Sequence, residues 1–127
     1  MIINVGCMEI DINLSNGLYT LPELGGVGKT YLFELLQAQS IDDKSIACYT
    51  YDYHHDEISN DFTYHNERIL IFDRMDLYVT KELLSSLSSL RNCIILCDLK
   101  LGCVKNKYPF KYTNMYLESG KIVVEDA

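Results

Sequence analysis

The sequence predicts an α/β fold: a mostly parallel sheet flanked by helices, with an antiparallel strand pair at the N-terminus and a hairpin at the C-terminus. Two observations predict it. Apolar runs of strand length alternate with segments of helical periodicity, an order typical of parallel sheets. The chain has 127 residues, 48% of them hydrophobic, which suits one domain with its own core. No repeat or linker divides residues 1–127, so we interpret them as a single domain.

Each end of the chain carries a predicted antiparallel strand pair. At the N-terminus the strands are expected at 2–13 and 18–21, because a turn-prone Ser-Asn-Gly separates two apolar stretches. At the C-terminus they are expected at 114–118 and 121–125, joined by a Ser-Gly turn. These pairs are expected to be additions to the parallel sheet.

Two helices are predicted from apolar residues at helical spacing. The first runs from about Lys29 to Gln39, after Pro22 has ended the preceding strand and a glycine-rich loop has followed. Its apolar residues are Leu32, Leu35, Leu36 and Ala38. The second covers residues 80–90, with Thr80 as its N-cap. Its inward-facing residues are Leu83, Leu84, Leu87 and Leu90.

The remaining strands are predicted at 45–51, 68–72 and 92–97. The last two are continuous apolar runs, which is typical of strands buried on both faces of a sheet. Ligands of such sheets bind beyond the carboxyl ends of the strands. The glycine-rich loop, Asp73 and Asp98 each follow a predicted strand, so we expect them to converge on one edge of the sheet.

The segment from Glu23 to Thr30 follows the phosphate-loop pattern of Gly, four residues and Gly-Lys-Ser/Thr, except that Glu23 replaces the first glycine. Glycines let backbone N–H groups turn toward phosphate oxygens, and the start of a helix adds a positive dipole end. Lys29 would reach the β- and γ-phosphates. The alternative interpretation is a glycine-rich turn that has a structural role and binds no ligand. The candidate nucleotide-binding residues are Gly25, Gly26, Val27, Gly28, Lys29, Thr30 and Tyr31.

Four apolar residues at 69–72 end in Asp73, an arrangement in which the carboxylate holds Mg²⁺ through water. With the Thr30 hydroxyl, Asp73 is the candidate ligand of Mg²⁺. Arg74 follows where many ATPases carry a catalytic glutamate, and Asp76 is the nearby acid that could substitute for it. Asp73 and Asp76 are therefore the candidate catalytic residues, and we expect slow hydrolysis at most.

These motifs resemble the P-loop NTPase superfamily over most of the chain. The Gly25–Thr30 loop is similar to that of the chromosome- and plasmid-partition ATPases, whose extra lysine would fall at Leu24. The opening strand pair and the closing 117–123 segment look more like ABC-type ATPases. The stretch between Lys29 and Asp73 holds no Leu-Ser-Gly-Gly-Gln signature, so the resemblance is to a reduced ABC-like protein. It implies binding of MgATP or MgGTP through the loop and Asp73.

The charge is distributed unevenly along the chain. Residues 1–67 carry eleven Asp/Glu and two Lys, a net charge of −9, and residues 68–127 carry seven Asp/Glu and nine Lys/Arg, a net charge of +2; together they give the −7 of the chain. An acidic half disfavours broad non-specific binding of nucleic acid and suits a basic partner. The acidic segment 52–61 is the candidate protein-binding loop. Lys100–Tyr112, which mixes lysines with aromatic residues, is the candidate for nucleic-acid contact.

The five cysteines show no paired Cys-x-x-Cys and three lie in apolar strand-like runs, a pattern that suits reduced thiols in the cytoplasm. No apolar run approaches the length of a membrane span, and the N-terminus does not resemble a signal peptide. We therefore expect a cytoplasmic protein with no membrane contact. A homo-oligomer stays open, in which a second copy would supply an arginine to the nucleotide.

Two functions follow from these features. The first is a small nucleotide-binding protein with weak or no hydrolysis that acts as a switch or as a component of an assembly. The alternative is a non-catalytic inhibitor encoded by a phage or mobile element, for example of the anti-CRISPR type. Such an inhibitor would use the P-loop scaffold and an acidic surface to bind a protein partner.

Overall fold

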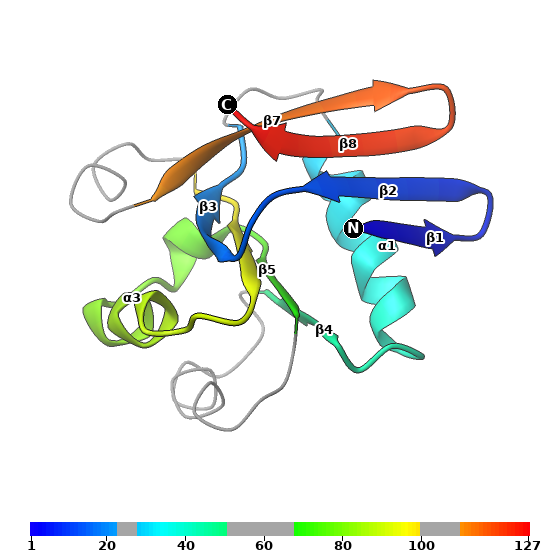
Figure 1. Ribbon diagram of the computed structural model, residues 1–127. Helices are drawn as coiled ribbons and strands as arrows, with labels where there is room; N and C mark the ends of the chain where they lie inside the picture. Colours follow the sequence, from blue (N-terminus) through cyan, green and yellow to red (C-terminus); the bar gives the residue numbers. More distant parts are fainter. Residues whose placement is uncertain (23–27, 51–67, 100–109) are drawn as a thin grey trace.

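The computed structural model describes residues 1–22, 28–50, 68–99 and 110–127 (Figure 1). The strands are β1 Ile2–Val5, β2 Met8–Asn13, β3 Gly17–Thr20, β4 Ile46–Tyr49, β5 Ile69–Phe72, β6 Ile94–Cys97, β7 Lys111–Glu118 and β8 Lys121–Asp126. The helices in these ranges are α1 Lys29–Ser40, α3 Lys81–Ser88 and a short 3₁₀ turn, η1 Met75–Leu77.

All eight strands belong to one mixed sheet with the order β1-β2-β8-β7-β3-β6-β5-β4. Strands β7, β3, β6, β5 and β4 run parallel to one another. Strand β8 is antiparallel to β7, and β1 is antiparallel to β2. A parallel pairing of β2 with β8 joins the two terminal hairpins to each other. The sheet curls, so that its hairpin half turns over toward α1 (Figure 1).

The prediction of a mostly parallel, P-loop-type sheet flanked by helices is wrong. The molecule is mostly sheet, and the described residues contain only the short helices α1 and α3 besides η1. The terminal hairpins are not additions beside a parallel core, because the pairings of β2 with β8 and of β7 with β3 make them half of one continuous sheet. Both pairings join residues far apart in sequence, so no local pattern could reveal them.

The predicted pairing of 2–13 with 18–21 is also wrong. Residues 2–13 themselves form a hairpin that turns after Val5, and Ile3 lies opposite Ile10 across it. Gly6 adopts a φ of +61° in this turn, a left-handed conformation that favours glycine. Strand β3 pairs instead with β6 and β7. The C-terminal hairpin is confirmed and longer than expected, with Ser119 and Gly120 both at positive φ, as a two-residue hairpin turn requires.

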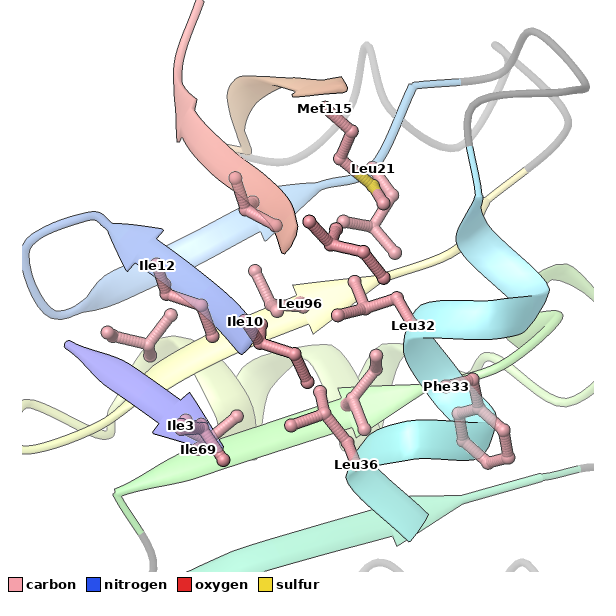
Figure 2. Packing of buried hydrophobic residues seen from close by; sticks show 14 of the residues in the cluster. Ile3, Ile10, Ile12, Leu21, Leu32, Phe33, Leu36, Ile69, Leu96 and Met115 are labelled. Carbon is pink, nitrogen blue, oxygen red and sulfur yellow. The ribbon is translucent and has the colours of Figure 1, made fainter. Parts of the chain in front are cut away.

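Helix α1 lies inside the curl of the sheet and fills the main core (Figure 2). Leu32 and Leu36 are fully buried and point toward Ile10 of β2 and Leu96 of β6, so the helix connects the two halves of the sheet. Phe33 is buried as well, although it was not among the apolar residues from which the helix was predicted. Of those residues, Leu35 is half-buried and Ala38 is exposed.

Helix α3 covers the opposite face of the sheet, behind β3, β6, β5 and β4. Its N-cap is confirmed: the Thr80 hydroxyl accepts a hydrogen bond from the Leu83 N–H at 3.0 Å. Leu83, Leu84 and Leu87 are buried in a second core cluster as predicted. Both faces of this half of the sheet are therefore covered, which explains the continuous apolar runs in β5 and β6.

Candidate functional site

The carboxyl ends of β3, β6, β5 and β4 lie along one edge of the sheet, because the four strands are parallel and in register. Thr20 of β3 and Phe72 of β5 both pair with Cys97 of β6. The residues that follow β6 and β5 are Asp98 and Asp73, so the predicted convergence of these two acids is present. The chain returns to this edge at residue 28, where α1 begins.

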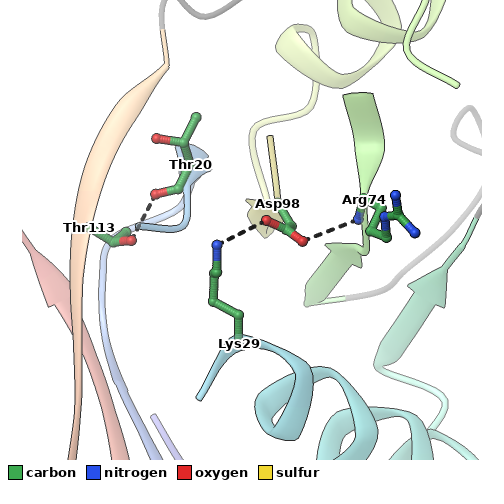
Figure 3. Close-up of polar contacts among 5 residues, drawn as sticks. All are labelled: Thr20, Lys29, Arg74, Asp98 and Thr113. Carbon is green, nitrogen blue, oxygen red and sulfur yellow. Dashed lines mark hydrogen bonds and ion pairs between the residues drawn. The ribbon is translucent and has the colours of Figure 1, made fainter. Parts of the chain in front are cut away.

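An ion pair between Lys29 and Asp98 is the central contact at this edge (Figure 3). The Lys29 Nζ lies 3.5 Å from the Asp98 Oδ1, and the two side chains are only 12% and 8% exposed. The second carboxylate oxygen of Asp98 accepts a hydrogen bond from the Arg74 N–H at 3.4 Å. A charge with so little exposure requires such partners, because its desolvation costs several kcal/mol. The pair therefore fixes the start of α1 against β6.

The start of α1 presents backbone N–H groups with no side-chain cap. Gly28 occupies the N-cap position with a φ of +91°, and no acidic residue lies in the first turn. The left-handed conformation explains why this position is a glycine. Thr30 and Tyr31 are exposed, Tyr31 by 41%. The first turn of α1 thus offers a positive dipole end, a lysine and an accessible hydroxyl in sequence.

The two candidate catalytic residues lie on the other side of Asp98. Asp73 is half-buried; its backbone N–H donates to the Tyr49 carbonyl at 2.9 Å and its carbonyl accepts from the Tyr78 hydroxyl at 2.9 Å. Asp76 lies in η1, and its Oδ1 is buried with no hydrogen-bond partner among the described residues. In those same ranges, no group of three or more His, Cys, Asp or Glu side chains could hold a metal.

Burial raises the pKa of the Tyr78 hydroxyl well above its ordinary value, and Cys97 and the carboxylates of Asp73, Asp98 and Asp76 add to the effect. Burial raises the pKa of the Cys97 thiol in the same way, with Asp98 contributing. Both groups therefore stay neutral, and Tyr78 serves as a hydrogen-bond donor. The acids give this edge a negative potential that the Lys29 ammonium partly balances.

Several predicted residues lie outside the described ranges. They are Gly25, Gly26 and Val27 of the loop, the acidic segment 52–61, and residues 100–109 of the lysine-aromatic segment. At the end of that last segment, Phe110 is buried, and the Lys111 Nζ lies 5.7 Å from the centre of the Tyr19 ring. Phe110 therefore belongs to the core, whereas Lys111 is exposed beside the Tyr19 ring.

Asp98 is the residue that sequence reasoning missed. Its position at the end of a buried strand was recognised, but no role was assigned to it. The available signal was the same as for Asp73, namely an apolar strand that ends in an aspartate. What the sequence could not indicate is that β6 lies between β3 and β5, which brings Asp98 to Lys29.

Among the described residues, no helix combines the length and apolar character needed to cross a membrane. No known protein family, no curated protein and no solved structure matches this chain.

Proposed function

We propose that this chain binds MgATP or MgGTP at the start of α1, hydrolyses it weakly or not at all, and acts as a switch or as a component of an assembly. The observation that carries the proposal is the Lys29 ammonium beside Asp98, at the first residue of α1 and at the edge where the parallel strands end. A lysine in this place has access to a phosphate bound at the helix start.

The described residues at the start of α1 have charges and chemical groups that suit a phosphate chain. The first turn of α1 holds no carboxylate, and its N-cap residue Gly28 has no side chain, so the positive end of the helix would meet a bound phosphate without an acidic neighbour in that turn. Lys29 would exchange its contact with Asp98 for one with phosphate. Thr30 would bind Mg²⁺, and Asp73 would hold it through water. Bound Mg²⁺ would neutralise part of the phosphate charge, which the negative potential of this edge makes necessary.

We propose weak hydrolysis because neither Arg74 nor Asp76, the two described residues closest in sequence after Asp73 that were considered for this role, is placed to activate water. Arg74, which follows Asp73, has a left-handed backbone with a φ of +49° and an exposed side chain. Asp76 has one buried carboxylate oxygen and is held in η1. A general base must reach the water whose proton it takes, and neither residue combines a carboxylate with a free approach.

Calorimetric titration of the chain with MgATP and with MgGTP tests the proposal. We expect saturable binding that Lys29→Ala weakens roughly 100-fold, as expected for loss of a charged contact to phosphate. Lys81→Ala, at the exposed first residue of α3, is the matched control and should bind as the unchanged chain does. Equal loss in both variants, or no binding at millimolar nucleotide, would refute a phosphate site at α1.

The cytoplasm is the proposed location. Cys7, Cys48 and Cys97 are free thiols, as expected for a protein kept in a reducing compartment. The alternative function, a non-catalytic protein that binds a basic partner, is favoured by one specific surface of the sheet, the acidic outer side of strands β1, β2, β8 and β7.

A further inference from the structure

The hairpin half of the sheet has an outer face that no described helix covers. Helix α3 and η1 cover the corresponding face behind β3, β6, β5 and β4. Over β1, β2, β8 and β7, alternate side chains point inward to the α1 core, and the others point away from it. We call the outward side chains of these four strands the outer face.

The strand register fixes which residues of the outer face are neighbours. One row crosses all four strands and consists of Ile2, Asp11, Val123 and Tyr116. The next row consists of Asn4, Glu9, Lys121 and Glu118. On the other side of the first row, Glu125 lies between Asn13 and Asn114. Ile2 and Tyr116 therefore lie at the two ends of the first row, with Asp11 and Val123 between them, and the rows on either side carry further carboxylates.

The two ends of the first row are accessible, and the outer face is negative. Ile2, on the edge strand β1, is 60% exposed and Tyr116, on β7, is 41% exposed, whereas Val123 between them is buried. The rows hold four carboxylates and one ammonium, a net charge of −3. That ammonium, on Lys121, already lies 4.0 Å from the Asp11 carboxylate. Desolvation raises the pKa of the Tyr116 hydroxyl, and the neighbouring Glu125, Glu118 and Asp11 add to the shift, in keeping with this negative potential.

We propose that the outer face docks a basic protein surface, one that sets an apolar group against the Tyr116 ring and arginine or lysine side chains against the carboxylates around it. The net charge of the outer face indicates which kind of partner binds it. A second copy of this chain would bring another net charge of −3 against the first, and a nucleic acid would bring phosphates; both are repelled. An exposed tyrosine ringed by carboxylates matches a partner in which cations surround an apolar centre.

This site is separate from the proposed nucleotide site and does not depend on it, because none of its residues belongs to the Lys29 and Asp98 edge. Its test uses a synthetic peptide in which arginine alternates with leucine, since such a strand presents both required chemistries. Binding is measured by amide chemical shifts of the labelled full chain. The same peptide with glutamine in place of arginine is the control for charge.

Two matched pairs of variants decide the outcome. Glu118→Lys with Glu125→Lys should weaken peptide binding roughly ten-fold, whereas Glu34→Lys with Glu82→Lys, an equal change of charge on α1 and α3, should change it less than about two-fold. Tyr116→Ala should weaken binding roughly ten-fold. Leu77→Ala, at a side chain of similar exposure (43%), should have no effect. Melting curves confirm that each variant is folded.

Shifts confined to outward residues of β1, β2, β8 and β7, with loss in the Glu118/Glu125 and Tyr116 variants alone, support the proposal. Equal loss in both charge-reversal pairs would overturn it, because binding would then follow net charge and no particular face. If the glutamine peptide binds as strongly as the arginine peptide, the proposal that the partner is basic is refuted. If Tyr116→Ala leaves peptide binding unchanged, the proposed apolar contact at Tyr116 is refuted.

Discussion

The Lys29–Asp98 ion pair shows how one contact between distant residues organises the candidate site. The two residues are far apart in sequence, and each has little exposed surface. The Asp98 carbonyl also accepts from the Met75 N–H at 2.8 Å, so the same residue holds the start of η1. One aspartate therefore links α1, β6 and the segment that carries Asp73 and Asp76.

Replacement of Asp98 should destabilise the fold more than replacement of a surface acid. Asp98→Ala leaves the Lys29 ammonium largely buried without its carboxylate, which should lower the free energy of unfolding by about 3 kcal/mol in urea denaturation. Asp11→Ala breaks a pair whose side chains are 35% and 19% exposed, and should cost no more than about 1 kcal/mol. Equal effects of the two changes would show that the Lys29 contact does not stabilise the fold.

Sequence reasoning at the residue scale succeeded where the cause is local. Thr80 was identified because a cap depends on the residues just after it. The glycine at position 28 was expected in a loop, and its positive φ explains it. Asp98 received no role because its partner is fixed by strand order. Strand order depends on contacts between distant segments, and single-residue patterns do not contain it.

At the scale of elements, the two helices begin in different ways. Helix α3 has a side-chain cap from Thr80 and an acid, Glu82, in its first turn. Helix α1 has neither, because its N-cap is Gly28 and no acid lies in its first turn. The difference agrees with the proposed function, since a helix start that binds an anion lacks a competing carboxylate, whereas a structural helix gains from a side-chain cap.

Removal of the α3 cap should therefore have a predictable effect on stability. Thr80→Ala should lower the free energy of unfolding by about 1 kcal/mol, because the Leu83 N–H loses its acceptor. Thr80→Ser keeps a hydroxyl and should restore most of that loss. The measurement is urea denaturation followed by circular dichroism. If serine and alanine behave alike, the hydroxyl is not what stabilises the helix start.

The elements themselves were predicted with uneven success. The C-terminal hairpin and α3 follow from turn and cap residues that act within a few positions. The N-terminal pairing failed because it was predicted from the Ser-Asn-Gly turn signal at 15–17 alone, whereas the hairpin turns at Gly6-Cys7. Both segments are turns in the broad sense, and local chemistry could not decide which of them closes a hairpin.

At the scale of the whole molecule, the sequence patterns could not predict that the sheet curls. Alternating strands and helices indicated layers, but the pairing of β2 with β8 turns the hairpin half over α1. The helix then packs against both halves, which is why it is apolar on a wide arc that includes Phe33. The outer face of the hairpin half is exposed for the same reason, since one helix cannot cover both sides.

This architecture predicts that the two halves of the sheet unfold together as one domain. Leu36 is fully buried in the cluster shared by the hairpin half and the parallel strands, so Leu36→Ala should lower the free energy of unfolding by about 3 kcal/mol. Leu35→Ala, at a half-buried position one residue away, should cost clearly less. Hydrogen exchange should show amides of β8 and of β5 losing protection by the same amount in Leu36→Ala, because both strands depend on α1. Loss of protection in one half alone would contradict a single cooperative domain over residues 1–127, and would mean that α1 belongs energetically to that half.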